Sequence, residues 1–314
     1  MRAVASIWWW VSLWCGASGT AAAAQQMADT TFYAEIESPA YVAGTGPVVL
    51  IDEAHHNYHT AAGRYLAFAT LLRRDGYVVL ASAEPFTARS LAQADILVVS
   101  NALNERNVED WSLPTPSAFA AHEVAAVREW VSAGGALMLI ADHMPMPGAA
   151  AMLAAEFGAR FLNGFAFDSE SDTEGPIIFR RSDGSLQPHP TTDGRDPSER
   201  VDSVASFTGQ AFEVGPTAIP IMVFRSNAVS FNPRVAWEFT ESTEKVSVGG
   251  WAQGAVLQFG AGRVALFGEA AMFTAQVAAT ESGRFPMGMN RPEAVQNQQF
   301  LLNVMHWLSS AGSH

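Results

Sequence analysis

Four short hydrophobic runs in the first half of the chain constrain the fold more than any other feature. They are residues 46–54, 76–82, 94–102 and 135–142. Each run is apolar nearly throughout, which is typical of strands buried on both faces, as in a parallel sheet. The amphipathic segments between them are 61–76, 88–93 and 117–135. This alternation predicts an α/β fold with a doubly wound, mainly parallel sheet flanked by helices.

The second half of the chain continues the pattern after an interruption. Further expected strands are 218–225, 250–260 and 262–270, a helix is expected after Gly148, and a final helix is expected over 292–310. Residues 168–200 are polar, contain proline and glycine, and have no sustained period, so we predict a surface excursion with a small hairpin. The sequence has no repeat and no clear linker. We therefore expect a single α/β domain over 46–311, preceded by an N-terminal extension over 25–45.

Residues 1–24 have the pattern of a secretory signal peptide. Arg2 is followed by an apolar run of about a dozen residues and by small residues that offer a cleavage site near Ala22 to Ala24. An uncleaved anchor is the alternative, but the run is shorter than the roughly 20 residues that a spanning helix needs. No later stretch is long and apolar enough to span a bilayer. We therefore expect a periplasmic or secreted protein with no integral membrane segment after cleavage.

Cysteine content and charge exclude several classes of function. Cys15 is the only cysteine, and cleavage would remove it, leaving no disulfide and no thiol nucleophile. The formal net charge of −13 becomes −14 once Arg2 is lost, because 17 basic residues then face 31 acidic ones. A field of this sign repels phosphate backbones, so nucleic acid is not an expected partner.

Polar residues collect where several of the predicted strands end. Asp52 and Glu53 end the first run, and three of the eight histidines follow at once: His55, His56 and His59. Later strand ends carry Ser100 with Asn101, Asp142 with His143, and Glu269. Ligands of open α/β sheets bind outside the carboxyl ends of the strands, so we expect these residues to share one rim.

The residue types at this rim suit a metal-dependent reaction. His55 and His59 are four residues apart and would share a face at a helix start, where the helix dipole keeps imidazole neutral and able to ligate. Neutral imidazoles and carboxylates are ligands for zinc and other divalent ions. The predicted metal ligands are Asp52, His55, His56 and His59. The predicted catalytic residues are Asp142, His143 and Glu269.

Structural roles are the alternative for each of these residues. Asp52 could accept backbone N–H groups at the strand end, Asn57 or Thr60 could cap the next helix, and His56 could form a hydrogen bond within its loop. The other histidines, His122, His306 and His314, are expected to be structural. His189, between two prolines, could fold over the site.

Familiar catalytic and nucleotide-binding motifs are missing from the sequence. It contains no G-x-S-x-G, which argues against a serine hydrolase, and no phosphate-binding or dinucleotide-binding fingerprint. The acidic alternation at 168–174 resembles a calcium loop only superficially, because the central glycine and closing glutamate do not follow.

Four stretches carry a resemblance to a known family. They are "VLIDEAHHNYHT", "VSAGGALMLIADHMPMPGAAAMLAAEFG", "GRVALFGEAAMF" and "GMNRPEAVQNQQFLLNVMHWL". They resemble an uncharacterised bacterial family with a class I glutamine-amidotransferase-like fold, related to domains of gliding-motility and intraflagellar-transport proteins. The resemblance covers roughly 46–310 and implies a flavodoxin-like three-layer sandwich. Amidotransferases of this class need a cysteine where this chain has Asp142, so the resemblance implies no amidotransferase activity, and many relatives of the fold are binding modules.

Two functions follow from these observations. The leading hypothesis is an exported metal-dependent hydrolase of unknown substrate, with zinc as one possible ion. The alternative is a non-catalytic periplasmic module that binds a small polar ligand or a saccharide, helped by Trp111, Trp251 or Asn290.

Overall fold

The predicted strands of the first half form the centre of a nine-stranded sheet. The computed structural model describes residues 25–168, 175–280 and 283–310. The four hydrophobic runs are β2 (Val48–Asp52), β3 (Val78–Ser82), β4 (Ile96–Ser100) and β5 (Ala136–Ile140). They lie in the order β3-β2-β4-β5, and β15 (Gly262–Phe267) follows β5. All four contacts between these five strands are parallel, which confirms the mainly parallel, doubly wound arrangement.

The sheet becomes antiparallel beyond β15, so it is mixed as a whole. β14 (Ala252–Phe259) pairs with β15, and its other partners are β10 (Phe212–Val214) and β11 (Ile219–Val223). β6 (Ala159–Phe161) closes this edge beside β10. At the parallel end, the chain runs from β2 outward to β3 and then back across β2 to β4. The strand order therefore reverses between β2 and β4, and crevices in sheets of this type open at such a point.

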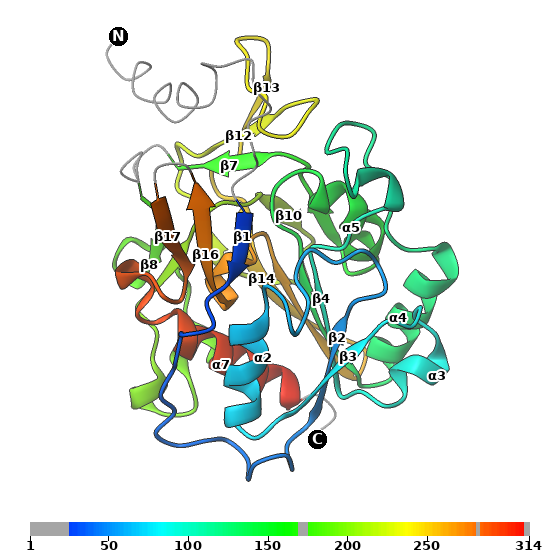
Figure 1. The fold of residues 1–314 in the computed structure, drawn as a ribbon, viewed down its shortest axis with the longest axis vertical. Coiled ribbons are helices and arrows are strands. Elements are labelled where there is room, and N and C mark those ends of the chain that lie inside the picture. The colour runs from blue at the N-terminus through cyan, green and yellow to red at the C-terminus, as the bar shows by residue number, and fades with distance from the viewer. Residues whose placement is uncertain (1–24, 169–174, 281–282, 311–314) are drawn as a thin grey trace.

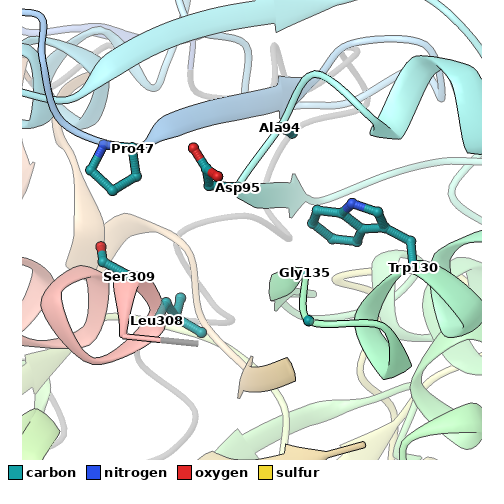
Figure 2. A pocket seen from close by; sticks show the side chains of 8 residues that line it. Pro47, Ala94, Asp95, Trp130, Gly135, Leu308 and Ser309 are labelled. Carbon is teal, nitrogen blue, oxygen red and sulfur yellow. The ribbon is translucent and has the colours of Figure 1, made fainter. Parts of the chain in front are cut away.

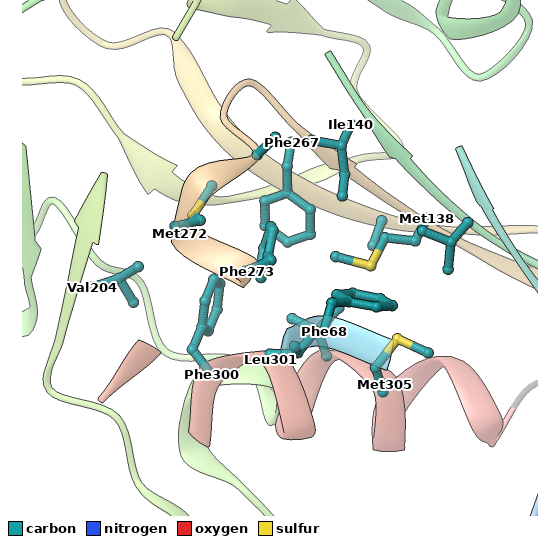
Figure 3. Packing of buried hydrophobic residues seen from close by; sticks show 14 of the residues in the cluster. Phe68, Met138, Ile140, Val204, Phe267, Met272, Phe273, Phe300, Leu301 and Met305 are labelled. Carbon is teal, nitrogen blue, oxygen red and sulfur yellow. The ribbon is translucent and has the colours of Figure 1, made fainter. Parts of the chain in front are cut away.

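Helices cover both faces of the sheet and make it a three-layer sandwich (Figure 1). One face carries α2 (Leu66–Arg74) and α7 (Asn297–Ser309), and the other carries α3 (Ala88–Leu91), α4 (Ala121–Ser132) and α5 (Met146–Glu156). Successive strand residues point to opposite faces, so Leu50 and Ile51 enter two different cores. Figure 3 shows one core, where Phe68 of α2 and Phe300 of α7 lie with Phe267 of β15.

Three small antiparallel sheets surround this sandwich. The first contains β1 (Gln25–Ala28), β16 (Ala275–Thr280) and β17 (Gly283–Gly288). The second contains β7 (Phe165–Phe167), β12 (Val229–Asn232) and β13 (Glu244–Ser247). The third is the pair β8 (Ile177–Arg180) and β9 (Ser203–Ser206). Short helices complete the chain: η1 (Glu105–Asn107), η2 (Arg181–Asp183), α6 (Pro190–Asp193), η3 (Pro197–Glu199), η4 (Ala271–Phe273) and η5 (Pro292–Ala294).

The polar segment at 168–200 is more closely attached to the domain than its composition suggests. Its described part, residues 168 and 175–200, contains β8 and α6 and buries Phe179 and Leu186 completely or nearly so. Arg225 holds it to the domain through ion pairs with Asp168, at 2.6 Å, and with Asp183, at 2.5 Å.

Two expectations concern membrane insertion and export. The predicted signal peptide, residues 1–24, lies outside the described residues. Among the helices of the described ranges, none is long and apolar enough to cross a bilayer.

Candidate functional site

The polar strand ends come together at the carboxyl edge of the sheet. Asp52 ends β2, Asn101 follows β4, Asp142 follows β5 and Glu269 follows β15. These are the central parallel strands, so their carboxyl ends share one edge. Asn101 joins two of the predicted motifs, because its Oδ1 accepts the Asp142 N–H at 2.8 Å and its Nδ2 lies 3.2 Å from Nδ1 of His59. The two motifs therefore meet although 83 residues separate His59 from Asp142.

His55 lies between two carboxylates. Its Nδ1 is 2.9 Å from both carboxylate oxygens of Asp52, and its Nε2 is 3.0 Å from Oε1 of Glu123 on α4. All three side chains are buried. Each ring nitrogen faces an acceptor, and only imidazolium carries a proton on both nitrogens.

The charges of this triad follow from its contacts. Burial opposes ionisation of His55, but the hydrogen bonds and charges of Asp52 and Glu123 outweigh it and raise the pKa of His55 above its ordinary value. Burial also opposes ionisation of Glu123, whose pKa is nevertheless lowered by the backbone N–H groups of Ala120 and Phe86 and by His55. The triad is therefore a charged link between the loop after β2 and the first turn of α4.

His59 is held as a neutral ring between two carboxamides. Burial, with a smaller contribution from the Arg64 charge, lowers the pKa of His59 to about 3. Because Asn101 Oδ1 already accepts the Asp142 N–H, Asn101 presents Nδ2 to the ring, and His59 Nδ1 accepts. The proton then lies on Nε2, 3.2 Å from the Gln276 side-chain amide. When the Gln276 carboxamide is turned so that its nitrogen and oxygen exchange places, Oε1 accepts the His59 proton. This oxygen has no other partner among the described residues.

Asp142 and Glu269 form a buried pair of carboxyl groups. Glu269 is 1% exposed, and its oxygens accept the N–H groups of Ala271, at 2.8 Å, and Met272, at 2.7 Å. Burial and the nearby Asp142 charge raise the pKa of Glu269 well above its usual range. Burial also raises the pKa of Asp142, which keeps 9% exposure. Two like charges disfavour each other at close range, so each carboxyl group opposes ionisation of the other.

His143 lies in a nest of aromatic rings. Its ring stacks on Phe165 with centroids 4.5 Å apart, and Trp237 and Trp111 lie at 4.7 Å and 5.9 Å. Burial lowers the pKa of His143 despite the Asp142 charge, so the ring is neutral at neutral pH. Its Nδ1 is 2.8 Å from the Met144 carbonyl oxygen and donates to it, which leaves Nε2 as an acceptor. Trp237 remains 48% exposed.

Backbone strain is concentrated at this edge. Among the described non-glycine residues, three have positive φ: His56 at 47°, Asn101 at 51° and Trp237 at 70°. A bulky residue such as Trp237 rarely adopts this conformation. His56 belongs to the loop after β2, Asn101 follows β4, and Trp237 packs on His143. Asn101 and Trp237 therefore adjoin Asp142 and His143, and His56 lies in the loop that carries His55 and His59.

The predicted metal ligands have other partners in this structure. Both ring nitrogens of His55 face carboxylates and both of His59 face amides, while His56 is exposed. Within the ranges that the structure describes, no group of three or more His, Cys, Asp or Glu side chains is arranged to hold a metal ion. The proposed roles of the seven predicted site residues stay predictions.

Some residues raised by the sequence lie elsewhere. His189 caps α6 and packs on Trp307 of α7 at 5.3 Å, so it does not cover the site. Trp251 lies under Arg160. Asn290 stays next to the site, because it donates to the Gln276 carbonyl as well as to Asp29. His306 bonds Asp75 at 2.7 Å, in keeping with a structural role.

Sequence reasoning missed Glu123, Trp237 and Gln276. Glu123 carries one signal, because a glutamate in the first turn of a helix often accepts a backbone N–H there, as it does from Ala120. Trp237 and Gln276 carry none, since each approaches a histidine far away in the chain.

A separate hollow of ≈ 310 Å³ lies at the amino edge of the sheet (Figure 2). Asp95 contributes its one carboxylate, and Trp130, Gly135 and Ser309 form other parts of the wall. The strained residues and the buried carboxyl pair are at the opposite edge, so the chemistry does not coincide with this hollow.

Comparison with solved structures identifies the fold. The N-terminal domain of mmIFT52 matches with a TM-score of 0.56 and 12% identity, over 85% of this chain and 99% of that one. A cytoplasmic protein from Salmonella typhimurium LT2 matches with a TM-score of 0.50 and 13% identity, over 83% of this chain and 98% of that one. The chain has the class I glutamine-amidotransferase-like fold.

This result confirms the fold that the sequence resemblance implied. Identities this low carry the fold alone and no reaction. No family model matches the chain, and no curated protein matches it. The function has to be argued from the site.

Proposed function

We propose that the protein is a binding module for a small polar ligand, with its site beside Asp142 and His143. The observation that carries this proposal is the backbone strain at His56, Asn101 and Trp237. Residues held in sparsely populated conformations cost of order 1–3 kcal/mol each and cluster where a ligand is bound. The order of the strands supports the same position, because the strand order reverses between β2 and β4.

The side chains at this edge suit recognition of a polar molecule. Trp237 is 48% exposed and offers an aromatic surface. It packs on His143, and the preceding residue, Asp142, is 9% exposed. Sites for small ligands combine aromatic surface with a few placed polar groups. A saccharide or another small polar molecule fits this chemistry.

The contacts of the histidines favour binding over metal-dependent hydrolysis. For His55 to ligate an ion, its ring would have to leave Asp52 or Glu123, which would expose a buried carboxylate to a non-polar environment. His59 would have to leave Asn101 or Gln276. Hydrolysis by a metal centre therefore stays the second candidate.

Thermal shift and elemental analysis together test the proposal. We expect some compounds in a panel of neutral, anionic and cationic small polar molecules to raise the melting temperature, since a ligand at 100 times its Kd stabilises by about 2.7 kcal/mol. The shift should vanish in Trp237→Ala and persist in Phe285→Ala, a control whose ring is similarly exposed at 45%. A panel without effect, or stoichiometric zinc, manganese or iron that His55→Ala removes, would contradict the proposal.

A further inference from the structure

The charge balance of the site indicates which kind of ligand it takes. No arginine or lysine of the described ranges forms an ion pair with Asp142 or Glu269. Asp142 has a neutral His143 as its neighbour and accepts the His143 backbone N–H at 3.0 Å. The negative charge of this carboxyl pair is therefore not balanced by a basic side chain of the described ranges. A buried charge of this kind favours a cation as its partner.

His143 adds a hydrogen-bond acceptor. The ring is 8% exposed, and its Nδ1 donates to Met144, so Nε2 is an unprotonated acceptor. Nε2 makes no hydrogen bond with a described residue, and this atom is not fully enclosed by the protein. It therefore reaches the surface, where a ligand N–H or O–H can donate to it.

The aromatic rings beside His143 also favour a cationic ligand. Trp237 and Trp111 flank His143, and the faces of aromatic rings attract cations, tryptophan most strongly. Arg64 already uses this interaction nearby, with its guanidinium carbon 3.7 Å from the centre of the Tyr58 ring. The formal net charge of −13 draws cations toward the protein as a whole.

We infer that the ligand carries a protonated amine or guanidinium group, which donates to His143 Nε2 and to the Asp142 carboxylate against the faces of Trp237 and Trp111. This inference rests on the proposed binding function and narrows its ligand class. Three features support it independently: the unbalanced carboxylate, the free acceptor nitrogen and the exposed tryptophan. A neutral saccharide could bond the acceptor nitrogen and pack on the tryptophan, but it would leave the charge of the carboxylate unbalanced.

Calorimetric titration with matched compounds tests this inference. The probes are agmatine and glucosamine, which carry cationic nitrogen, and glucose and N-acetylglucosamine, which are neutral. We expect both cationic probes to bind the protein, as purified from an exporting host, at least tenfold more tightly than the neutral probes. Asp142→Asn should remove this preference, Trp237→Ala should weaken binding of the cationic probes, and His122→Ala on the exposed face of α4 should change nothing.

The outcomes separate this inference from the binding function itself. Equal or tighter binding of glucose, still lost in Trp237→Ala, would overturn the amine preference and leave the binding module standing. Amine binding that is unchanged in both Asp142→Asn and Trp237→Ala would overturn the inferred contacts. Failure of both cationic probes to bind would also overturn the inference, while the wider thermal-shift panel decides the proposed function separately.

Discussion

Replacing His55 with alanine should destabilise the protein strongly. The change removes the ring from between Asp52 and Glu123, both of which are buried. Each hydrogen bond to a charged group contributes about 1.5–3 kcal/mol, and breaking a buried pair costs about 3–5 kcal/mol. Asp52 keeps Asn57 as a donor and Glu123 keeps the Phe86 N–H, so we expect the lower end, about 3 kcal/mol.

This free energy can be measured by urea and thermal unfolding. At about 2–4 °C per kcal/mol for a chain of this size, the melting temperature should fall by roughly 6–12 °C. The control is His122→Ala, an exposed histidine on α4, which should stay within about 0.5 kcal/mol of the unchanged protein.

The pH dependence distinguishes a charged His55 from a neutral one. Its raised folded pKa means that the stabilisation is fully present below the unfolded value of about 6.5 and is lost as pH rises through the folded value. The difference between the unchanged protein and His55→Ala should therefore be largest near about pH 5.5 and shrink toward alkaline pH. A loss that is the same from about pH 5.5 to pH 9, or no loss at all, would refute the argument.

Three further predictions address the carboxyl pair, the core and export. Burial raises the folded pKa of Asp142, so its ionisation opposes folding as pH rises above the unfolded value of about 4, and the stability of Asp142→Asn relative to the unchanged protein should increase from about pH 4 upward in urea titrations. Phe68→Ala, at a fully buried ring, should cost about 3–5 kcal/mol by the same method, and a cost below 1 kcal/mol would contradict the packing in Figure 3. Mass spectrometry of protein from an exporting host should find an N-terminus near Ala23 to Gln26, whereas intact Met1 in the soluble periplasmic fraction would contradict cleavage of a signal peptide.

The central sheet could be predicted because its inner strands, such as β4 and β5, are buried on both faces. The runs that became β2, β3, β4 and β5 are apolar throughout, and the helices between them end at glycine or are strongly amphipathic. The small antiparallel sheets left no comparable signal. Strands such as β7 and β12 have three or four residues, too few for a period to stand out. The sequence places β1 in an N-terminal extension because its partner, β16, lies some 250 residues away in the chain.

The gathering of these polar residues at one edge of the sheet was predictable, and the contacts between them were not. Parallel strands place their carboxyl ends together, so Asp52, Asp142 and Glu269 had to share an edge. The partner of each histidine depends on side chains far away in the sequence: Glu123 for His55 and Gln276 for His59. Spacing alone made His55 and His59 resemble metal ligands, whereas packing gave them carboxylate and amide partners.

Ligand-induced shifts of the tryptophan indole signals test the central claim that the carboxyl edge is the binding site. The described residues contain five tryptophans: Trp111, Trp130, Trp237, Trp251 and Trp307. Their indole N–H resonances can be assigned by single substitution and followed during titration with agmatine, glucosamine or the strongest compound of the thermal-shift panel. We predict that Trp111 and Trp237, which contact His143, shift together while the other three stay in place. Shifts confined to Trp130, in the wall of the hollow at the amino edge, would contradict the account.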